Sequence, residues 1–337
     1  MSEPRVTVVI PTLHAGPALL ECLRSLREQS FRDFEVFVVD NSGAGLISKL
    51  KVGSLVTHVI ENQKNVGFGV AINQVFYKSR APYLAVLNDD AVAHPQWLES
   101  LLKPLENYPN VGMCASQVRL AESLLLDSAG MLLCPDGTSK QRGHGLPPSR
   151  FPAVEEVLLP SGSAAIYRRR MLEEIGLFDD KFFLYCEDTD LGLRARWAGW
   201  KCLYVPEAIV NHRYSESAGR ASKLKAYLVE RNRIFMVIKN FPIRMLLAVP
   251  FYAVARFWWH FIFMLQGKGK AAEFREEGNS VFTLVAYVIR AHLAAIVRLP
   301  ALLKDRRRIR KQAKISSTAF KELVQTFSIS PREVASL

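Results

Sequence analysis

An amide and two carboxylates end an apolar run near position 90. Residues 84–92 read LAVLNDDAV, so a run of strand length stops at Asn88, Asp89 and Asp90. Clustered carboxylates at the carboxyl end of a buried strand lie on the edge where open α/β sheets bind ligands. A divalent cation and a diphosphate would meet there. The alternative is that Asp89, Asp90 and Pro95 only end a strand and begin a helix.

A second acidic group lies about 100 residues further along the chain. Glu187, Asp188 and Asp190 follow an apolar, aromatic stretch and precede a helical pattern. Acids at a helix N-terminus cap the helix and favour its dipole, which is the structural alternative to a catalytic role. His212 follows a predicted strand at residues 201–205, and a lone histidine there is more often a surface or core residue than a ligand.

The elements that position these groups alternate between strands and helices. Strands are predicted at residues 6–10, 34–39, 57–60 and 84–87, and helices begin near Pro17, after Gly69 and at Pro95. This alternation predicts a parallel, doubly wound sheet whose polar carboxyl ends share one edge.

The middle of the chain predicts fewer regular elements. A further strand is predicted at residues 111–118, and a helix from about Arg169 ends at Gly176. Residues 134–152 are rich in Pro and Gly and predict a long loop. Residues 158–167 are mostly small, which would let the backbone approach a ligand closely.

Charge is unevenly distributed along the 337 residues, of which 49% are hydrophobic and 23% charged. Residues 1–220 carry 23 Lys and Arg against 25 Asp and Glu, a net charge near −2, and residues 221–337 carry 21 against 7, near +14. The asymmetry indicates a neutral catalytic or binding domain followed by a segment that meets an anionic membrane or nucleic acid. Five cysteines without metal spacing favour reduced thiols in a cytosolic compartment, and the start of the chain predicts no signal peptide.

Positions 5 to about 240 resemble family 2 glycosyltransferases of the GT-A fold, and within them the rhamnosyltransferase-like branch. Each motif alone is weak, and the ordered set carries the resemblance. The motifs are Val8-Val9-Ile10-Pro11-Thr12, Val38-Val39-Asp40-Asn41-Ser42, Asn65-Val66-Gly67-Phe68 with Asn73, Leu87-Asn88-Asp89-Asp90, Ser161-Gly162-Ser163-Ala164, Glu187-Asp188-Thr189-Asp190, Asn211-His212, and Tyr227 with Arg231-Asn232-Arg233 and Lys239-Asn240-Phe241-Pro242.

The resemblance implies an α/β, Rossmann-like GT-A catalytic domain with a mostly parallel central sheet over residues 1–220. A C-terminal amphipathic, basic, helical and membrane-associated region follows over residues 221–337. The implied reaction is the inverting, metal-dependent transfer of a sugar from a nucleotide-diphosphate donor, with dTDP-rhamnose preferred. The implied acceptor is a saccharide or a polyprenyl-diphosphate-linked acceptor of cell-wall or surface-polysaccharide synthesis.

The resemblance also assigns catalytic roles. Asp90 takes the last position of the family's Asp-x-Asp motif and is expected to bind Mg²⁺ or Mn²⁺, and His212 resembles the histidine that completes the metal site in some members. Asp188 is expected to remove the acceptor proton, with Glu187 as the fallback or as the group that orients the acceptor.

Donor binding is assigned to a larger set of residues, most of them at strand ends. Arg194 and Arg196 are also candidates for a phosphate contact, with helix-surface solvation preferred for Arg196. The expected nucleotide-sugar-binding residues are Pro11, Thr12, Asp40, Asn65, Gly67, Asn88, Asp89 and Gly162.

Two apolar stretches, residues 243–265 and 281–303, are long enough to span a bilayer. Arginines interrupt both, which favours helices lying in the membrane interface with Trp258 and Trp259 at headgroup level. The predicted location is therefore the cytoplasmic face of the cell membrane, as a peripheral or monotopic protein. The alternatives are core helices of a helical domain or a homodimer interface. A basic cluster suited to an anionic leaflet follows: Lys304, Arg306, Arg307, Arg308, Arg310, Lys311 and Lys314.

Three other functions compete with this interpretation. The same domain would serve a UDP-linked donor such as N-acetylglucosamine, galactose or galactofuranose. A nucleic-acid-binding protein would explain the basic tail, but the tail lacks aromatic residues interleaved with basic ones, so no nucleic acid is expected as a partner. A catalytically silent subunit is disfavoured because Asp90, Asp188 and His212 are all present.

Overall fold

The computed structural model describes residues 3–50, 52–53, 56–213, 223–267, 269 and 281–336. The chain forms two compact units. The first comprises Met1–Met131, Gln141–Leu184 and Gly199–Ser217, and the second comprises Leu132–Lys140, Tyr185–Ala198 and Ala218–Leu337. The predicted boundary between residues 220 and 221 lies outside the described residues and stays a prediction.

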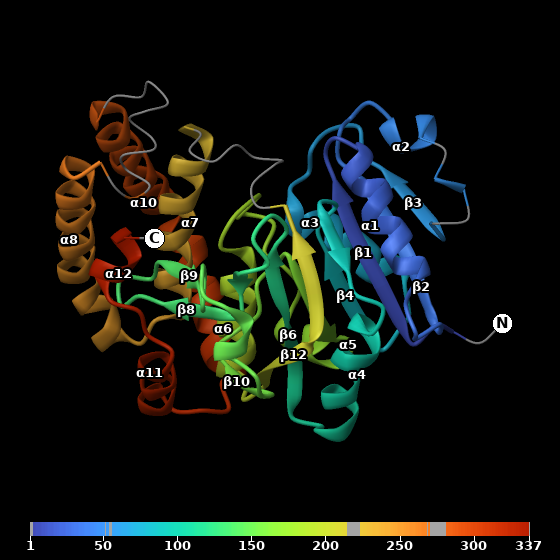
Figure 1. Cartoon of the computed structure of the whole chain (residues 1–337). Helices are drawn as coiled ribbons and strands as arrows, with labels where there is room; N and C mark the ends of the chain where they lie inside the picture. The colour runs from blue at the N-terminus through green and yellow to red at the C-terminus, as the bar shows by residue number, and fades with distance from the viewer. Residues whose placement is uncertain are drawn as a thin grey trace. The chain divides into compact units, whose positions relative to one another are not determined.

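A mixed, mostly parallel sheet forms the first unit (Figure 1). Its main path has the order β10-β12-β6-β11-β4-β1-β2-β3, with β5 paired to β12 and β7 paired to β6. The predicted α/β class is confirmed. The strands are β1 (Val6–Thr12), β2 (Phe34–Asp40), β3 (His58–Glu61), β4 (Tyr83–Leu87), β5 (Ala91–Ala93), β6 (Val111–Leu120), β7 (Leu126–Ser128), β10 (Glu155–Val157), β11 (Ala164–Arg168) and β12 (Lys201–His212). The separate pair β8 (Met131–Leu133) and β9 (Ser139–Gln141) makes a second, two-stranded sheet.

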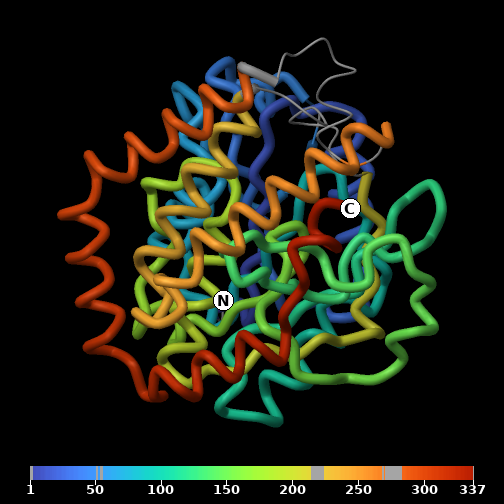
Figure 2. Tube along the Cα trace, turned by 90° about the vertical axis from the view of Figure 1, so that its left-hand side faces the viewer, coloured from blue at the N-terminus to red at the C-terminus, as the bar shows by residue number. Residues whose placement is uncertain are grey.

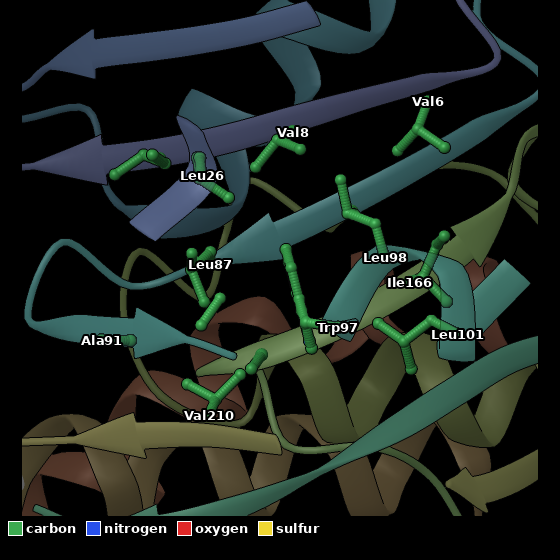
Figure 3. Close-up of a cluster of buried hydrophobic side chains, with 14 of the residues drawn as sticks. Val6, Val8, Leu26, Leu87, Ala91, Trp97, Leu98, Leu101, Ile166 and Val210 are labelled. Carbon is green, nitrogen blue, oxygen red and sulfur yellow. The ribbon is translucent and has the colours of Figure 1, made fainter. Parts of the chain in front are cut away.

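The core of this unit fixes the sheet edge that carries the polar residues. Alternate residues of β1 pack in one cluster with α1 (Pro17–Arg27) and α4 (Trp97–Asn107). Trp97 lies among these side chains in Figure 3, and its indole N–H donates to the Ser116 hydroxyl at 2.9 Å. A fully buried tryptophan with its one donor satisfied stabilises the core without a polar penalty. The remaining helical segments are α2 (Leu46–Lys49), α3 (Phe68–Lys78), α5 (Arg169–Ile175) and the 3₁₀ turn η2 (Pro148–Arg150).

Two segments differ from their prediction in ways that affect the site. The small-residue stretch at 158–167 contains the buried first four residues of β11, which runs antiparallel between β4 and β6. The strand predicted at residues 201–205 continues as β12 to His212, with a register shift between Val205 and Ile209. Pro206 lies inside this shift, and because proline has no N–H to donate, it interrupts the ladder without ending the strand.

Helices make up most of the second unit: α6 (Glu187–Trp197), α7 (Lys223–Asn240), α8 (Ile243–Leu265), α10 (Val281–Gln312), α11 (Ser317–Thr326) and α12 (Pro331–Ser336). α10 packs along α7, and α12 packs on α8. Figure 2 shows α10 as one long run of helical turns in orange and red. Phe320 of α11 stacks on Trp197 of α6, with ring centroids 4.0 Å apart.

Two expectations about arginines were wrong. Arg194 and Arg196 are both buried, because α6 is covered by α7 and α10. The Arg194 guanidinium pairs with Asp190 at 2.8 Å and therefore cannot meet a donor phosphate, and Arg196 is not a solvated surface residue.

In the predicted basic cluster, Arg306 donates to the carbonyl oxygens of Ile238 and Phe241.

Candidate active site

The turn after β4 brings two sequence-distant residues together. β5 pairs antiparallel with β12, and Ala91 lies opposite His212 in this ladder. Asp90 precedes Ala91, so its carboxylate oxygen Oδ1 lies 3.2 Å from His212 Nε2. Asn88 Nδ2 lies 3.3 Å from the same nitrogen. The backbone N–H of Arg213 donates to Asp90 O at 3.1 Å, which fixes the turn against the end of β12.

A residue that the sequence did not single out completes this cluster. Asp127, in β7, is 2% exposed, and its Oδ2 lies 3.0 Å from His212 Nδ1. The other carboxylate oxygen, Oδ1, lies 3.3 Å from His144 Nδ1. The sequence contained one indication of this residue, because Asp127 is a carboxylate that directly follows the apolar run at residues 124–126. We call Asp90, Asp127, His144 and His212 the sheet cluster.

The sheet cluster changes the protonation of its members. Burial disfavours a charged His212, but contacts with Asp127 and Asp90 outweigh burial and raise the pKa of His212 to about 10. Burial likewise disfavours ionised Asp127, but His144 and His212 lower the pKa of Asp127 below its usual value. Without a metal, His212 is therefore an imidazolium at neutral pH.

Asp89 has a different environment from Asp90. The Thr12 hydroxyl donates to Asp89 Oδ2 at 2.5 Å, and the same hydroxyl oxygen accepts the N–H of Ala15 at 3.1 Å. Burial raises the pKa of Asp89, and the Thr12 bond opposes that rise only in part. The ends of β1 and β4 thus share one polar network, as their parallel pairing predicts.

Asp40 at the end of β2 organises its own turn. Its two carboxylate oxygens accept the N–H groups of Ser42, at 2.8 Å, and of Ile47, at 3.0 Å. Burial alone would raise the pKa of Asp40, but these hydrogen bonds outweigh it and lower the pKa. The predicted nucleotide contact of Asp40 stays a prediction.

The other expected donor-site residues lie on loops and strand ends of the same unit. Asn65 Oδ1 accepts the N–H of Gly67 at 2.9 Å. Gly67 has φ +88°, and a side chain there would collide with the Phe183 carbonyl, so the fold itself requires this glycine. Pro11 lies in β1. Gly162 lies between Ser161 and Ser163, whose hydroxyl oxygens are 2.9 Å apart.

Glu187 and Asp188 form the first turn of α6 in the second unit. Glu187 is buried, and burial together with the charge of Asp188 raises its pKa to about 8. Asp188 is half-buried, and its Oδ1 accepts the Thr189 N–H at 2.6 Å. Tyr185 and Cys186 just before this turn have positive φ, a backbone state that is costly without glycine and is often found at functional sites.

Side chains of α7 hold this turn. Asn232 is fully buried, and its Nδ2 donates to the Tyr185 carbonyl at 2.7 Å. Lys239 Nζ and Asn240 Nδ2 each lie 2.9 Å from Asp190 Oδ1. The sequence motifs around Asn232 and Lys239 therefore have a structural explanation, which is that they anchor the acidic turn from a neighbouring helix.

The sheet cluster fits a divalent cation bound by few protein groups. Asp90 Oδ1 is buried, and among the described residues it accepts no well-aligned hydrogen bond. Its 3.2 Å distance from His212 Nε2 is close to the about 3 Å between neighbouring ligands of an octahedral ion with bonds of about 2.1 Å. No group of three or more His, Cys, Asp or Glu side chains in the described part of the chain makes a complete metal site. Mg²⁺ in particular is often bound by one or two protein groups together with substrate phosphates and water.

Comparison with known proteins gives the class of this chain. Residues 4–236 match the family described as "Glycosyltransferase like family 2". The N-acetylglucosaminyl-diphospho-decaprenol L-rhamnosyltransferase of Mycobacterium tuberculosis is 29% identical over 250 residues, which are 65% of this chain and 80% of that protein. An uncharacterized glycosyltransferase of Bacillus subtilis, YwdF, is 28% identical over 240 residues, 66% of this chain and 81% of that protein.

Two solved structures share the fold. GalNAc-T7, crystallised with UDP, GalNAc and Mn²⁺, superposes with a TM-score of 0.54 at 14% identity, over 70% of this chain and 51% of that chain. Residues 1–349 of S. aureus TarS superpose with a TM-score of 0.50 at 18% identity, over 94% of this chain and 91% of that chain. The chain thus covers about half the length of GalNAc-T7 and most of the TarS fragment.

The chain belongs to glycosyltransferase family 2, and its first unit has the GT-A fold. The protein is a glycosyltransferase that uses a nucleotide-sugar donor. Both expectations drawn from the ordered motifs are confirmed.

Proposed function

We propose that the protein transfers L-rhamnose from dTDP-rhamnose, with inversion at the anomeric carbon, to a polyprenyl-diphosphate-linked saccharide. The observation that supports a metal-dependent reaction is that Asp90 Oδ1 and His212 Nε2 lie 3.2 Å apart at the sheet edge. The choice of donor and acceptor is supported by the M. tuberculosis relative, whose name specifies L-rhamnosyl transfer to a decaprenol-linked acceptor.

In this proposal Asp90 and His212 hold Mg²⁺ or Mn²⁺. When bound, the ion supplies positive charge that neutralises the leaving diphosphate. Asp89, fixed by the Thr12 hydroxyl, contacts the ribose or the donor sugar. Asn88 lies beside His212 and contributes to the donor site rather than to the metal. The donor site also includes Pro11, Asp40, Asn65, Gly67 and Gly162.

The two acids of α6 have different tasks in this proposal. Asp188 accepts the proton of the acceptor hydroxyl. We assign this role to Asp188 because it is only half-buried, whereas burial suppresses the ionisation of its neighbour Glu187. Glu187, with a pKa raised to about 8, is mostly protonated at neutral pH and acts as a hydrogen-bond donor that orients the acceptor.

A transfer assay with the full-length protein tests this function. The donor is dTDP-rhamnose, the acceptor is an N-acetylglucosaminyl diphosphate with a short polyprenyl chain, and Mn²⁺ is added or chelated. We expect a rhamnosylated product whose formation requires the metal. UDP-N-acetylglucosamine, UDP-galactose and UDP-galactofuranose are offered in parallel. Transfer from one of them, with none from dTDP-rhamnose, would overturn the rhamnose assignment and leave the glycosyltransferase class standing.

A single substitution tests the base. Asp188→Asn removes the proton acceptor with little change in shape, so we expect transfer to be lost while dTDP binding, followed by calorimetry, stays near normal. Asp180→Asn makes the same chemical change at an exposed position and is the matched control. Turnover of Asp188→Asn within a few-fold of the wild type would exclude this role.

We also propose that α8 and α10 lie on the anionic cytoplasmic leaflet. Both are long and apolar enough to cross a membrane by length and composition, and little of either is buried within the described structure. Arg256, about halfway along α8, is buried and pairs with Asp136 and Glu230. A spanning α8 would carry these charges into hydrocarbon, which favours a helix lying in the interface.

The exposed side chains of the two helices support contact with lipid. On α8 the most exposed apolar residues recur every three or four positions, which places them on one face. On α10 an exposed apolar face is followed by the exposed basic residues Lys304, Arg307, Arg308 and Lys311, which complement anionic headgroups. The most exposed apolar residues are Ile243, Leu247, Phe251, Val254, Trp258, Phe261 and Leu265 of α8, and Val285, Ile289, Leu293, Ile296 and Val297 of α10.

Vesicle flotation tests the membrane proposal. We expect the protein to float with phosphatidylglycerol-containing vesicles, and we expect high salt to weaken this binding without abolishing it. Leu247→Asp, at a side chain that is 70% exposed, should weaken flotation, whereas Tyr77→Asp, at a 78% exposed position of α3, should not. No flotation of the wild type at low salt would contradict the proposal and favour an interface between copies of the chain.

A further inference from the structure

We infer that Asp127 is a positioning residue that fixes the imidazole of His212, so that Nε2 of this ring is available to a divalent cation beside Asp90. The inference rests on the proposed metal site. It gives a function to a buried carboxylate outside every motif described above.

The argument begins with the two nitrogens of an imidazole. A neutral histidine binds a metal through one nitrogen and carries a proton on the other, so the partner of the second nitrogen decides which one faces the metal. In His212, Nδ1 faces Asp127 Oδ2 at 3.0 Å, and Nε2 faces Asp90 Oδ1 at 3.2 Å. Asp127 therefore keeps the proton on Nδ1 and leaves Nε2 for the cation.

The carboxylate of Asp127 is itself held in place. Asp127 is 2% exposed, and its Oδ1 faces His144 Nδ1 at 3.3 Å. The same nitrogen lies 3.2 Å from the Asp127 carbonyl oxygen. The hydrogen bond of Oδ2 with His212, and the hydrogen bond of the Asp127 carbonyl oxygen with His144, therefore place the Asp127 carboxylate between the two rings.

Strand pairing explains why these groups meet. β7 pairs with β6, where Val118 lies opposite Ser128, and β6 pairs with β12, where Leu120 lies opposite His212. Asp127 of β7 and His212 of β12 thus lie on strands that both pair with β6. Supporting groups placed on strands hold a ligand more precisely than groups on loops do.

Mn²⁺ binding tests the inference without turnover. Free Mn²⁺ is followed by electron paramagnetic resonance while the full-length protein is titrated, alone and with dTDP. Asp127→Ala should weaken Mn²⁺ affinity about 10- to 100-fold, the usual effect of losing such a supporting group. Asp127→Asn should have a smaller effect, because its amide oxygen still accepts the Nδ1 proton.

Two further variants make the outcomes distinguishable. Glu155→Gln removes a carboxylate from the same sheet, one that pairs with Arg142 at 2.8 Å, and should leave Mn²⁺ affinity unchanged. Asp90→Ala removes a proposed ligand and should weaken binding at least as much as Asp127→Ala. If Asp90→Ala leaves Mn²⁺ affinity unchanged, the proposed metal site is wrong, and the inference fails with it.

A purely structural role for Asp127 has its own signature. In that case Asp127→Ala would lower the melting temperature, while Asp127→Asn, if folded, would bind Mn²⁺ as tightly as the wild type. Normal Mn²⁺ affinity in both Asp127 variants, alongside weakened affinity in Asp90→Ala, would overturn the positioning role alone. Weakened affinity in a variant whose melting temperature matches that of Glu155→Gln would support it.

Discussion

Each unit of the protein buries a cluster of charged side chains, and the two clusters differ in charge balance. The sheet cluster brings the carboxylates Asp90 and Asp127 to the ring of His212. The second unit buries Asp136, Glu230, Arg233 and Arg256, which we call the helical cluster. Both are assembled from residues far apart in sequence, and both contain two acids.

The helical cluster is closed and neutral. Arg256 bridges the two acids, with Nε at 2.5 Å from Asp136 Oδ2 and Nη2 at 3.0 Å from Glu230 Oε2. Arg233 Nη2 lies 2.5 Å from Glu230 Oε1. Burial opposes ionisation of Asp136, but Arg256 and Arg233 outweigh it and lower the pKa of Asp136 to about 2. Two guanidinium groups, which stay charged at any ordinary pH, cancel two carboxylates.

The sheet cluster, in contrast, is open and acidic. Its two carboxylates share the imidazole of His212, and neither Asp90 Oδ1 nor Asp127 Oδ1 accepts a well-aligned hydrogen bond from the residues described. An imidazolium also releases its proton to make way for a cation, which a guanidinium does not. A buried cluster that has a carboxylate oxygen without a hydrogen bond and a histidine proton that can leave is suited to binding a metal ion. A buried cluster whose charges cancel is suited to stabilising the fold.

The largest expected effect comes from removing the open acceptor. Asp90→Ala should lower the transfer rate by at least about a thousandfold, because neutralising the leaving diphosphate contributes several kcal/mol. Its free energy of unfolding should fall only modestly, because His212 loses its ion pair with Asp90 but keeps the one with Asp127. Initial rates against Mn²⁺ and urea unfolding measure both. A rate within tenfold of the wild type would place the metal elsewhere.

Removing an arginine from the helical cluster should mainly lower stability and leave donor binding intact. Arg256→Met leaves buried Asp136 and Glu230 short of a partner, which should cost about 3–5 kcal/mol of unfolding free energy. Binding of dTDP by the molecules that remain folded should be unaffected. Urea unfolding measures the loss, and Arg298→Met, at an exposed arginine of α10, is the control, with an expected change of about 0.5 kcal/mol or less. An equal, small change in both variants would show that the helical cluster does not stabilise the fold.

The comparison also explains what the sequence could predict. The strands near Val6, Phe34 and Tyr83 were predictable, because short apolar runs that end at polar residues have few other interpretations. Asp90 and His212 were predictable as partners only through the resemblance. Their contact depends on the β5 to β12 ladder, and no local pattern encodes a ladder between strands some 120 residues apart.

Asp127 and Arg194 were missed or misassigned for a physical reason. Asp127 reaches His212 only because β7 pairs with β6, and β7, with three residues, is too short to be predicted from an apolar pattern. Arg194 was a candidate for a phosphate contact, but it is buried within the second unit and pairs with Asp190 instead. Burial of charged residues follows from tertiary packing and is invisible to a helical pattern.

A smaller effect should appear in the pH dependence of metal binding. The pKa of His212 is raised to about 10, so its contribution to stability is present below about pH 6.5 and is lost as pH rises through about 10. Mn²⁺ must displace the Nε2 proton, so its affinity should rise up to about tenfold per unit between pH 7 and pH 9. His212→Gln should bind Mn²⁺ more weakly and without this slope. A flat profile in the wild type would mean that no proton leaves His212 when Mn²⁺ binds.

The smallest effect extends the comparison to Glu187, a buried acid whose pKa is raised by burial and by the charge of Asp188. With a pKa raised to about 8, about nine-tenths of Glu187 is protonated at pH 7. Glu187→Gln resembles that neutral form and should keep the transfer rate at pH 7 within about threefold. Above pH 8 the wild type gains a second negative charge beside Asp188, and its rate should fall, whereas the rate of Glu187→Gln should not. The pH–rate profiles of the two proteins measure this. A loss of a hundredfold or more at pH 7 would mean that Glu187 acts as a carboxylate, and the base would then be reassigned from Asp188 to Glu187.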